Sequence, residues 1–420
     1  MTSVREPVAE VLGKVLGPGA ALGIRAYDGS RSGPEEPEVA LDIRSPKALS
    51  YLVTGLGELG LVRAYVSGEL DLDGDVYTVL QYLARTDVGR LTLPERVRAL
   101  RAMDPAVFRW VPPPPEEAPP AVRRAMTGLR HSKRRDAEAI SHHYDVSNQF
   151  YEWVLGPSMA YTCAVFPTED STLEEAQYEK FDLVARKLGL RPGQRLLDVG
   201  CGWGGMVIHA AKHYGVSALG VTLSQEQSDW AQKAIADEGL TGLAEVRHAD
   251  YRDVPEGGFD AVSSIGLTEH IGARALPGYF DCLRSKLRPR GRLLNHCITR
   301  PTTTEGVKAA AFIDRYVFPD GELVAVGHLA GVMQDAGLEV RHAENLREHY
   351  AMTLAAWGRN LDAHWDEAVA DVGLGRARVW ALYMAGSRLG FEENRIQLHQ
   401  VLGVRTDDRG RADMALRPDW

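Results

Sequence analysis

From about residue 195 onward, short apolar runs alternate with amphipathic segments of helical length. Segments such as GMVIHAAKHYG and QEQSDWAQKAIADEG have the periodicity of helices. The apolar runs predict five strands, at RLLDVG (195–200), SALGVTL (217–223), AEVRHAD (244–250), FDAVSSIG (259–266) and GRLLNHCI (291–298). Because strands separated by crossover helices pair in parallel and are covered on both faces, we expect an α/β fold with a doubly wound sheet.

The flanking regions predict less regular structure. LEVRHAENL (338–346) and RIQLHQVLGVR (395–405) are candidate late strands, and residues 302–335 are expected to form a mainly helical insert. Residues 20–75 alternate short apolar runs with Gly, Asp and Pro turns, which predicts a small sheet with helices at either end. The proline-rich VPPPPEEAPPAV (111–122) predicts an extended linker. We therefore expect domains at 1–110 and 123–420.

Composition narrows the class of protein. In 420 residues, 45% are hydrophobic and 25% are charged, as in ordinary soluble proteins. We find no apolar window long enough to span a membrane and no cleavable leader, so we expect a cytoplasmic protein. Four cysteines without a C-x-x-C pair argue against a disulfide framework and a structural zinc site, so no metal is expected. A net charge of -9 gives no general case for nucleic acid.

RRAMTGLRHSKRR, residues 123–135, is a local exception to the acidic balance, because it gathers six basic side chains without an acid. One interpretation is a solvated basic helix face, and the other is a patch that contacts an anionic surface. The second interpretation gains support only if the substrate is a lipid.

Gly200-Cys201-Gly202-Trp203-Gly204-Gly205 matches the dinucleotide pattern G-x-G-x-x-G and follows the first predicted strand. A dinucleotide places its diphosphate at the following helix, where the carboxylate of Asp198 would repel it. The amino acid tail of S-adenosylmethionine has an ammonium group instead, which favours an acid at this position. Asp198 could alternatively serve only as a helix cap. Gly200 and Gly202 let the backbone approach a ligand.

The next two strand ends support the same cofactor. The second strand leads into Thr222 and on to Gln227, with no acid at the tip where dinucleotide enzymes bind the ribose, so Gln227 is the candidate ribose partner and Thr222 belongs to the same site. Asp250 and Tyr251 follow the third strand and offer an acceptor and a ring for an adenine. We predict S-adenosylmethionine as the cofactor.

DVGCGWGG followed by GVTLSQEQ, with HHYDVSNQFYEWVLGPSMAYTCAVF upstream and TEHIG downstream, resembles the cyclopropane fatty acid synthases and the mycolic acid methyltransferases over about residues 135–405. RAYVSGELDLDGD (63–75) resembles the small lipid-carrier-like domain of the bacterial phospholipid enzymes. The resemblance implies a class I S-adenosylmethionine methyltransferase fold, Rossmann-like with a late antiparallel strand, and a small N-terminal α+β domain.

The resemblance also implies a reaction and its residues. Members of the family transfer a methyl group to a cis double bond of a lipid acyl chain, through a carbocation that a bound bicarbonate ion deprotonates. The cradle of this ion would consist of Cys163, Glu269, His296, the backbone of Ile298, and Tyr350. By the same resemblance, Tyr144 and Tyr161 would approach the methionine end or the sulfonium of the cofactor.

Each of these residues also has a structural explanation. Cys163 could be a small core thiol, His296 a core histidine with its hydrogen bonds satisfied, and Glu269 a helix cap. Tyr350 could be a buried aromatic residue, and Trp203 could either wall the site or pack in the core. In the order typical of the family, the functional interpretation is favoured.

Two positions depart from the family. Leu267-Thr268 replaces the usual aromatic residue before the glutamate-histidine pair, and Cys297 stands where threonine is common. A smaller or more polar wall beside the carbocation could change which proton leaves. We therefore expect either a cyclopropane or a methylene product, the precursor of 10-methylstearate, and favour the methylene branch.

The expected partners are phospholipid acyl chains at the membrane surface, a second copy of the chain in a homodimer, and a separate reductase for a methylene product. The enzyme would then associate peripherally with the inner face of the membrane. Three other functions remain open at this stage: a methyltransferase for a small soluble nucleophile, a lipid-binding protein without catalysis, and a nicotinamide enzyme.

Overall fold

The computed structural model describes residues 6–17, 22–55, 57–85, 103–119, 146–304, 309–319 and 321–420. The chain divides into two compact units. Unit 1 comprises Met1–Pro119, Ala310–Val317 and Trp365–Leu389, and unit 2 comprises Pro120–Ala309, Phe318–His364 and Gly390–Trp420. Tyr144 and the basic stretch 123–135 lie outside the described residues.

Unit 1 contains a four-stranded sheet of order β2-β1-β3-β4, in which only β1 and β3 are parallel. Ser45 and Asp75 cap two of its helices by accepting hydrogen bonds from backbone amides of the first turn. The elements from its N-terminal segment are α1 (Val8–Leu16), β1 (Gly23–Ala26), β2 (Arg31–Ser32), β3 (Ala40–Ile43), α2 (Pro46–Thr54), α3 (Leu59–Val66), β4 (Leu70–Asp73), α4 (Val76–Ala84) and the 3-10 helix η2 (Pro105–Phe108).

The division differs from the predicted domain boundaries. Residues 111–119 of the predicted linker belong to unit 1, where the buried carboxylate of Glu117 pairs with Arg63 and Arg315. Segments 310–317 and 365–389 also belong to unit 1, although the sequence pattern assigned them to the catalytic domain. Periodicity reports the local conformation of a segment, and it does not report which distant segment the buried face contacts.

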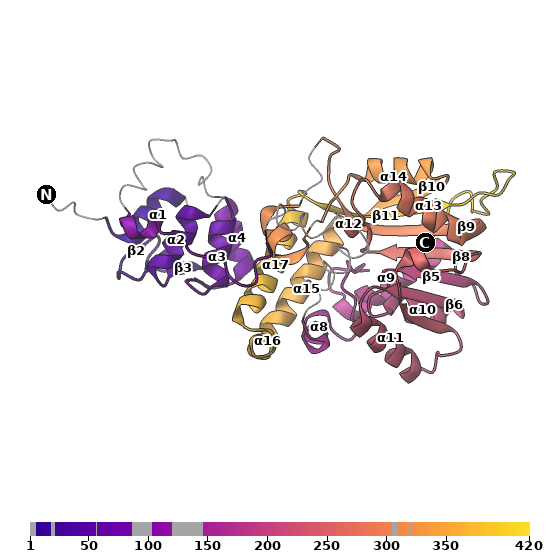
Figure 1. Cartoon of the computed structure of the whole chain (residues 1–420), viewed down its shortest axis with the longest axis horizontal. Coiled ribbons are helices and arrows are strands. Elements are labelled where there is room, and N and C mark those ends of the chain that lie inside the picture. The colour runs from indigo at the N-terminus through magenta and orange to yellow at the C-terminus, as the bar shows by residue number, and fades with distance from the viewer. Residues whose placement is uncertain are drawn as a thin grey trace. The chain divides into compact units, whose positions relative to one another are not determined.

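Unit 2 is built on a seven-stranded sheet of order β10-β11-β9-β8-β5-β6-β7 (Figure 1). Strands β5 to β9 are mutually parallel, and β11 is antiparallel to both β9 and β10. The strands are β5 (Arg195–Val199), β6 (Ser217–Thr222), β7 (Ala244–His248), β8 (Phe259–Ile265), β9 (Leu287–Thr299), β10 (Glu339–Asn345) and β11 (Gln397–Val404). The seven predicted strands and the late antiparallel strand are confirmed.

Successive strand residues point to opposite faces, so the sheet has two cores. Leu196, Ala218 and Val246 pack with α9, α10 and α11 on one face, and Leu197 and Val221 pack with α13 and α14 on the other (Figure 1). The helices of unit 2 are α8 (Asn148–Leu155), α9 (Leu173–Leu188), α10 (Gly205–Tyr214), α11 (Gln225–Asp237), α12 (Thr268–Ile271), α13 (Leu276–Lys286), α14 (Val326–Asp335) and α15 (Arg347–Ala363).

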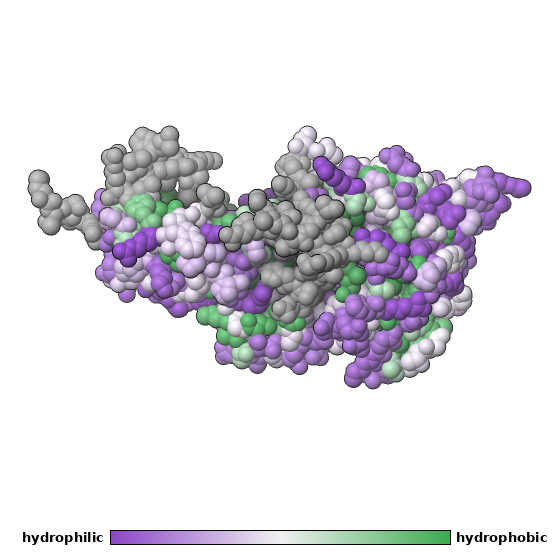
Figure 2. Space-filling view, viewed as in Figure 1, coloured by the Kyte–Doolittle hydropathy of each residue, from purple (hydrophilic) through white to green (hydrophobic). Residues whose placement is uncertain are grey.

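The predicted helical insert near 302–335 is only partly helical where it is described. It contains a π-helix at Ile313–Val317 and α14, and these two elements belong to different units. The remaining helices are the 3-10 helix η3 (Tyr251–Asp253), α16 (Trp365–Val372) and α17 (Leu374–Glu392). Among the described residues, the helices are all too short or too polar to cross a bilayer, and the visible surface of unit 2 is mostly hydrophilic (Figure 2).

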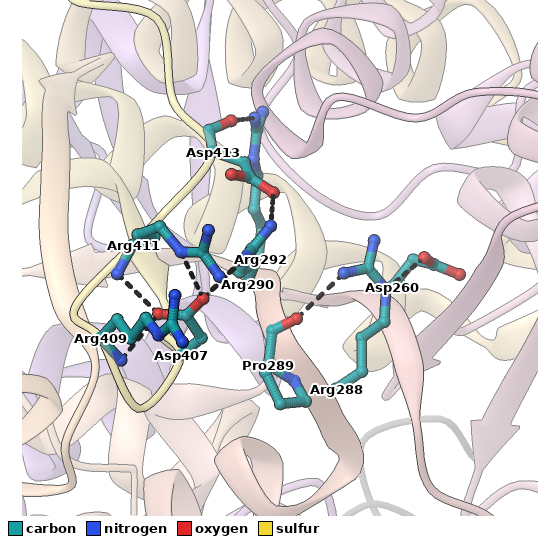
Figure 3. Close-up of polar contacts among 9 residues, drawn as sticks. All are labelled: Asp260, Arg288, Pro289, Arg290, Arg292, Asp407, Arg409, Arg411 and Asp413. Atoms are coloured by element: carbon teal, nitrogen blue, oxygen red, sulfur yellow. Dashed lines mark hydrogen bonds and ion pairs between the residues drawn. The ribbon is translucent and has the colours of Figure 1, made fainter.

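The C-terminal tail is fixed to the beginning of β9 by charged side chains. Arg290, at a φ of 66°, binds Asp407 and Asp413, and Arg409 and Arg411 donate further hydrogen bonds to Asp407 (Figure 3). These bonds hold the pKa of Asp407 below its usual range despite the opposing effect of burial. These contacts lie at the amino end of β9. The C-terminal tail is thus bound at the end of the strand opposite to the carboxyl ends, where ligands bind in parallel sheets.

Candidate active site

The turn after β5 forms the centre of the site. Gly200, Gly202 and Gly204 all have positive φ, at 70°, 55° and 81°, so the chain turns sharply between β5 and α10. A Cβ at Gly200 would lie 3.1 Å from the Leu267 side chain, whereas a Cβ at Gly202 would point into open space. The two glycines thus keep the surface of the turn free of side chains.

Two small cavities meet at this turn. Gly200, Gly202, Gln227 and Gly266 line both of them. One cavity also contacts Thr222 and Tyr251, and the other also contacts Tyr161, Lys180 and Asp198. Of the predicted cofactor residues, the structure therefore brings together Tyr161, Asp198, Gly200, Gly202, Thr222, Gln227 and Tyr251.

Asp198 is the only carboxylate among the described residues that line these two cavities. Its side chain is 2% exposed, and Oδ1 accepts a hydrogen bond of 2.6 Å from the Ser263 hydroxyl on β8. Burial raises the pKa of Asp198 to about 7, although Ser263 and the charge of Lys180 oppose the rise. A cation that entered the cavity would favour the ionised carboxylate, as the predicted ammonium partner requires.

The other cofactor candidates differ in their contacts. The Thr222 hydroxyl donates to Gln227 Oε1 at 2.7 Å, which orients the amide at the tip of β6. Asp250 caps the short helix η3 and accepts hydrogen bonds from Arg252 on both carboxylate oxygens. Its proposed contact with an adenine stays a prediction. Tyr251 lines the cavity and packs edge-to-face on Tyr279 at 5.3 Å.

Lys180 was missed by the sequence analysis. It is fully buried on α9, and it lines the same cavity as Asp198. The signal was present in the sequence, because Lys180 and Lys187 lie at helical spacing with Ala176, Gln177 and other residues that α9 buries. A lysine on the buried face of a helix is rare unless it has a partner.

A second cluster of polar side chains follows β8 and β9. The backbone N–H of Ile298 donates to Glu269 Oε1 at 2.7 Å, so it is engaged by the glutamate, whereas the family resemblance assigned it to a bound ion. Glu269 Oε2 is buried and has no hydrogen-bond partner among the described residues. Burial raises the pKa of Glu269 to about 7 against the effect of the Ile298 N–H. The carboxyl group can therefore carry a proton near neutral pH.

The hydrogen bonds around His296 define its tautomer. Lys187 Nζ donates to Gln400 Oε1 at 2.7 Å, which orients the amide so that Nε2 faces His296 Nδ1 at 3.2 Å. Burial lowers the pKa of His296 well below its usual value, so the ring is neutral. Since Gln400 Nε2 can only donate, the network assigns the ring proton to Nε2. This atom is buried without a partner among the described residues.

Cys163 and Tyr350 lie close to this cluster through the backbone of Leu346. The Cys163 thiol contacts the Leu346 carbonyl at 3.8 Å, and Tyr350 N donates to the same carbonyl. Leu346 N in turn donates to Leu398, the β11 partner of Ile298. Burial raises the pKa of Cys163, so the group is a neutral thiol. Hydrogen bonds thus connect the segments that carry Cys163 and Tyr350, through β11, to the strand that carries Ile298. The joint role of the five residues as an ion cradle stays a prediction.

Aromatic side chains connect the two clusters. Tyr350 contacts Trp357 edge-to-face, Trp357 lies 5.3 Å from Tyr161, and Tyr161 lies 5.9 Å from Tyr151. Tyr151 packs on Trp203 at 4.7 Å. Apolar rings of this size exclude water from the space beside them. Trp203 therefore both packs and walls the cofactor cavity, combining the two roles predicted for it.

The positions that depart from the family also lie here. Leu267 lines the cofactor cavity, and the Thr268 hydroxyl donates to Asn295 Oδ1 at 2.6 Å. Asn295 Nδ2 lies 3.2 Å from the Cys297 sulfur, which is buried in the core. Thr268, Asn295 and Cys297 thus form one buried polar row.

The sheet order with a late antiparallel strand, the glycine turn and the acid before it define a class I S-adenosylmethionine-dependent methyltransferase. The family model "Mycolic acid cyclopropane synthetase" matches residues 131–401. The chain therefore belongs to this family of methyltransferases, and the resemblance seen in the sequence is confirmed.

Known relatives extend beyond the catalytic unit. The chain is 55% identical to a probable fatty acid methyltransferase of Mycobacterium tuberculosis, over 100% of both chains. It is 40% identical to a probable fatty acid methyltransferase of Pseudomonas putida, over 94% of each chain.

Solved structures match the catalytic region. The cyclopropane synthase MmaA2 of M. tuberculosis is 33% identical with a TM-score of 0.60, over 65% of this chain and 98% of that one. The mycolic acid cyclopropane synthase CmaA1 in complex with SAH and CTAB is 31% identical with a TM-score of 0.60, over 64% of this chain and 98% of that one. A methyltransferase cofactor site is thus supported over a nicotinamide site.

Replacing Asp198 by asparagine should weaken binding of S-adenosylhomocysteine (SAH). A hydrogen bond to a charged group contributes about 1.5–3 kcal/mol, so we expect Kd to rise about 10- to 150-fold in calorimetry. Wild-type affinity should fall as the pH drops from about 7 to about 5.5, because Asp198 becomes protonated, and the D198N variant should lack this dependence. Asp237→Asn, an exposed control on α11, should bind like wild type. Unchanged SAH binding by D198N would contradict the assignment.

Proposed function

We propose that the protein transfers the methyl group of S-adenosylmethionine to the cis double bond of an unsaturated phospholipid acyl chain. The observation that carries the proposal is the buried cluster beside the cofactor turn, in which Glu269 Oε2 and His296 Nε2 face no hydrogen-bond partner among the described residues. Buried polar atoms in a native fold normally have partners, so these two atoms indicate a site for a polar ligand. The fatty acid methyltransferases among the relatives support a lipid acceptor.

An alkene is a weak nucleophile, so the reaction depends on the surroundings of the double bond. When bound, the cofactor supplies an electrophilic methyl group. The chain's own contribution is to hold the acyl chain against that group and to exclude water, which would otherwise react with the carbocation. The rings of Tyr161, Trp357 and Tyr350 supply such an apolar wall between the two clusters.

The acid-base groups fit a small anion that acts as the base. Neutral His296 donates through Nε2–H, and Glu269 can donate when it carries its proton, which its pKa of about 7 allows. Both groups would then hold bicarbonate without a fixed negative charge facing it. When bound, bicarbonate would supply a weak base for the proton that leaves the newly attached methyl group.

The nature of the product depends on which carbon bears the positive charge at deprotonation. Direct proton loss from the new methyl group closes a cyclopropane, and proton loss after a hydride shift gives a methylene group, the precursor of 10-methylstearate. Leu267 stands where the family usually has an aromatic residue. Its aliphatic side chain has no π face, so it would stabilise the first-formed carbocation less than an aromatic ring would. We propose that this favours the hydride shift and the methylene branch, with reduction left to a separate enzyme.

The product can be identified in a host that does not otherwise make it. In cells that express the protein and receive oleate, phospholipid fatty acids should gain the mass of one CH2 unit, and fragmentation should locate the change at the former double bond and distinguish a ring from a methylene group. Host cells with the empty vector serve as the control. If the purified protein methylates small phenols or amines and leaves the phospholipid unchanged, the alternative of a soluble nucleophile is correct.

Glu269→Gln should slow turnover without loss of cofactor binding. The amide cannot exchange a proton with the bound anion, so we expect kcat to fall about 10²- to 10⁴-fold, as for loss of a general acid-base group. The Kd for SAH should change less than about twofold, since Glu269 lines neither cofactor cavity. Glu256→Gln, at a half-buried ion pair with Arg247 that lines neither cofactor cavity, is the control. Wild-type turnover by E269Q would place the acid-base chemistry elsewhere.

We also propose that the enzyme docks on the membrane surface to reach acyl chains. The basic stretch 123–135 supports this by its charge, because each basic side chain near an anionic bilayer contributes about 1 kcal/mol. In unit 1, Phe108 and Trp110 are 47% and 73% exposed on either side of Arg109. Buried Val107 and the Asp104 cap hold the turn that presents them. Exposed aromatic and basic side chains suit a bilayer interface.

Vesicle sedimentation tests this docking. Charge reversal of Arg123, Arg124, Arg134 and Arg135 should reduce binding to anionic vesicles, most strongly at low salt, and Phe108→Ser with Trp110→Ser should reduce it at any salt concentration. Leu374→Ser, at an exposed apolar residue of the same unit, is the control and should bind normally. Unchanged vesicle binding and activity for both sets of variants would exclude these surfaces.

A further inference from the structure

Lys180 places a buried ammonium group in the cofactor cavity. Its Nζ donates a hydrogen bond of 2.9 Å to Thr162 Oγ1 and lies 3.9 Å from the centre of the Phe181 ring. The side chain is fully buried, and both Lys180 and Thr162 line the cavity that also contacts Asp198. Neither the family resemblance nor the proposed acid-base chemistry assigns a role to this lysine. Burying a charge is costly, so a buried ammonium calls for a partner.

The cavity thus holds one group of each charge. Burial lowers the pKa of Lys180 to about 7, against the raising effects of Cys163 and Asp198, and burial raises the pKa of Asp198 to about 7. Without a ligand, burial therefore destabilises the charged form of each group. A ligand that has both a cation and an anion would restore the ordinary ionisation of both. The amino acid tail of S-adenosylmethionine is such a ligand, because it has an ammonium group and a carboxylate on one carbon.

The direction of the hydrogen bond from Lys180 to Thr162 also favours binding of an anion. An ammonium group has only donors, so Thr162 Oγ1 accepts from Lys180 and its own hydroxyl proton remains to be donated elsewhere. Gln177 Nε2 fixes the strand-like loop that carries Thr162 by donating to the carbonyls of Ala160 and Thr162, at 3.2 and 3.0 Å. A hydroxyl held in this way next to a cation is a good donor to a carboxylate.

We infer that Lys180 and the Thr162 hydroxyl bind the carboxylate of the cofactor's amino acid tail, while Asp198 binds its ammonium group. Lys180 acts partly through Thr162 and is therefore a positioning residue for the tail. The inference rests on S-adenosylmethionine as the cofactor and is independent of whether the methyl acceptor is a lipid. Cys163 does not neutralise Lys180, since burial raises the pKa of Cys163 and keeps it a thiol.

Two ligands that differ in the tail test this inference. SAH has the complete amino acid tail, and 5′-methylthioadenosine has the same adenosine and sulfur without it. In calorimetry at about pH 7, Lys180→Met should weaken SAH about 10- to 100-fold, as loss of a charged hydrogen bond does, and change 5′-methylthioadenosine less than about twofold. Thr162→Val should show the same selective loss to a smaller extent, and Thr162→Ser should retain wild-type affinity.

Lys233→Met is the control, because Lys233 is an exposed lysine of α11 that lines neither cofactor cavity. It should leave SAH affinity unchanged. Equal weakening of both ligands by K180M would show a structural role, and unchanged affinity for both would exclude Lys180 from the site. If K180M does not fold, the selective loss in T162V decides the question. A failure of lipid methylation in the product analysis would leave this binding result standing.

Discussion

The burial of Asp198 at the end of β5 is the constraint on which the rest of the site depends. A carboxylate that is 2% exposed needs compensating groups, and the fold provides Ser263 from β8 and Lys180 from α9. β8 pairs with β5 in the parallel sheet, and α9 packs on one face of that sheet. The arrangement is favourable for a cofactor with an ammonium group and unfavourable for a diphosphate. The same carboxylate therefore favours one class of cofactor over the other, and our proposal for the cofactor tail is built on it.

Two buried lysines of α9 relate the cofactor site to the acid-base cluster. Lys180 contacts the loop that carries Thr162, and Lys187, two turns later, sets the orientation of Gln400 and through it the tautomer of His296. The helix begins with a capping box at Thr172 and ends at Gly189 in the left-handed conformation, so its register is well fixed. One helix thus orients polar groups on both sides of the reaction centre.

The family relationship and the physical arguments support each other at different levels. The family model covers the catalytic region, and the two fatty acid methyltransferases match nearly the whole length of the chain, including the N-terminal segment. The geometry adds what similarity alone does not contain: a neutral His296, a Glu269 able to carry a proton, and an aromatic wall between cofactor and acid-base cluster. Together they are consistent with a methyltransferase of this family whose reaction takes place away from water.

The catalytic fold, and most of the residues that line the candidate cofactor cavities, could be predicted from the amino-acid sequence. Period-two and helical patterns are local, so the seven strands of unit 2 could be predicted, and a parallel sheet necessarily gathers its carboxyl ends, which brought Asp198, Gln227 and Tyr251 together. The burial and contacts of Lys180 and Gln400, and the membership of 365–389 in unit 1, became apparent only in the folded chain. These features depend on contacts between segments that are far apart in the sequence, and local patterns along the chain do not predict such contacts.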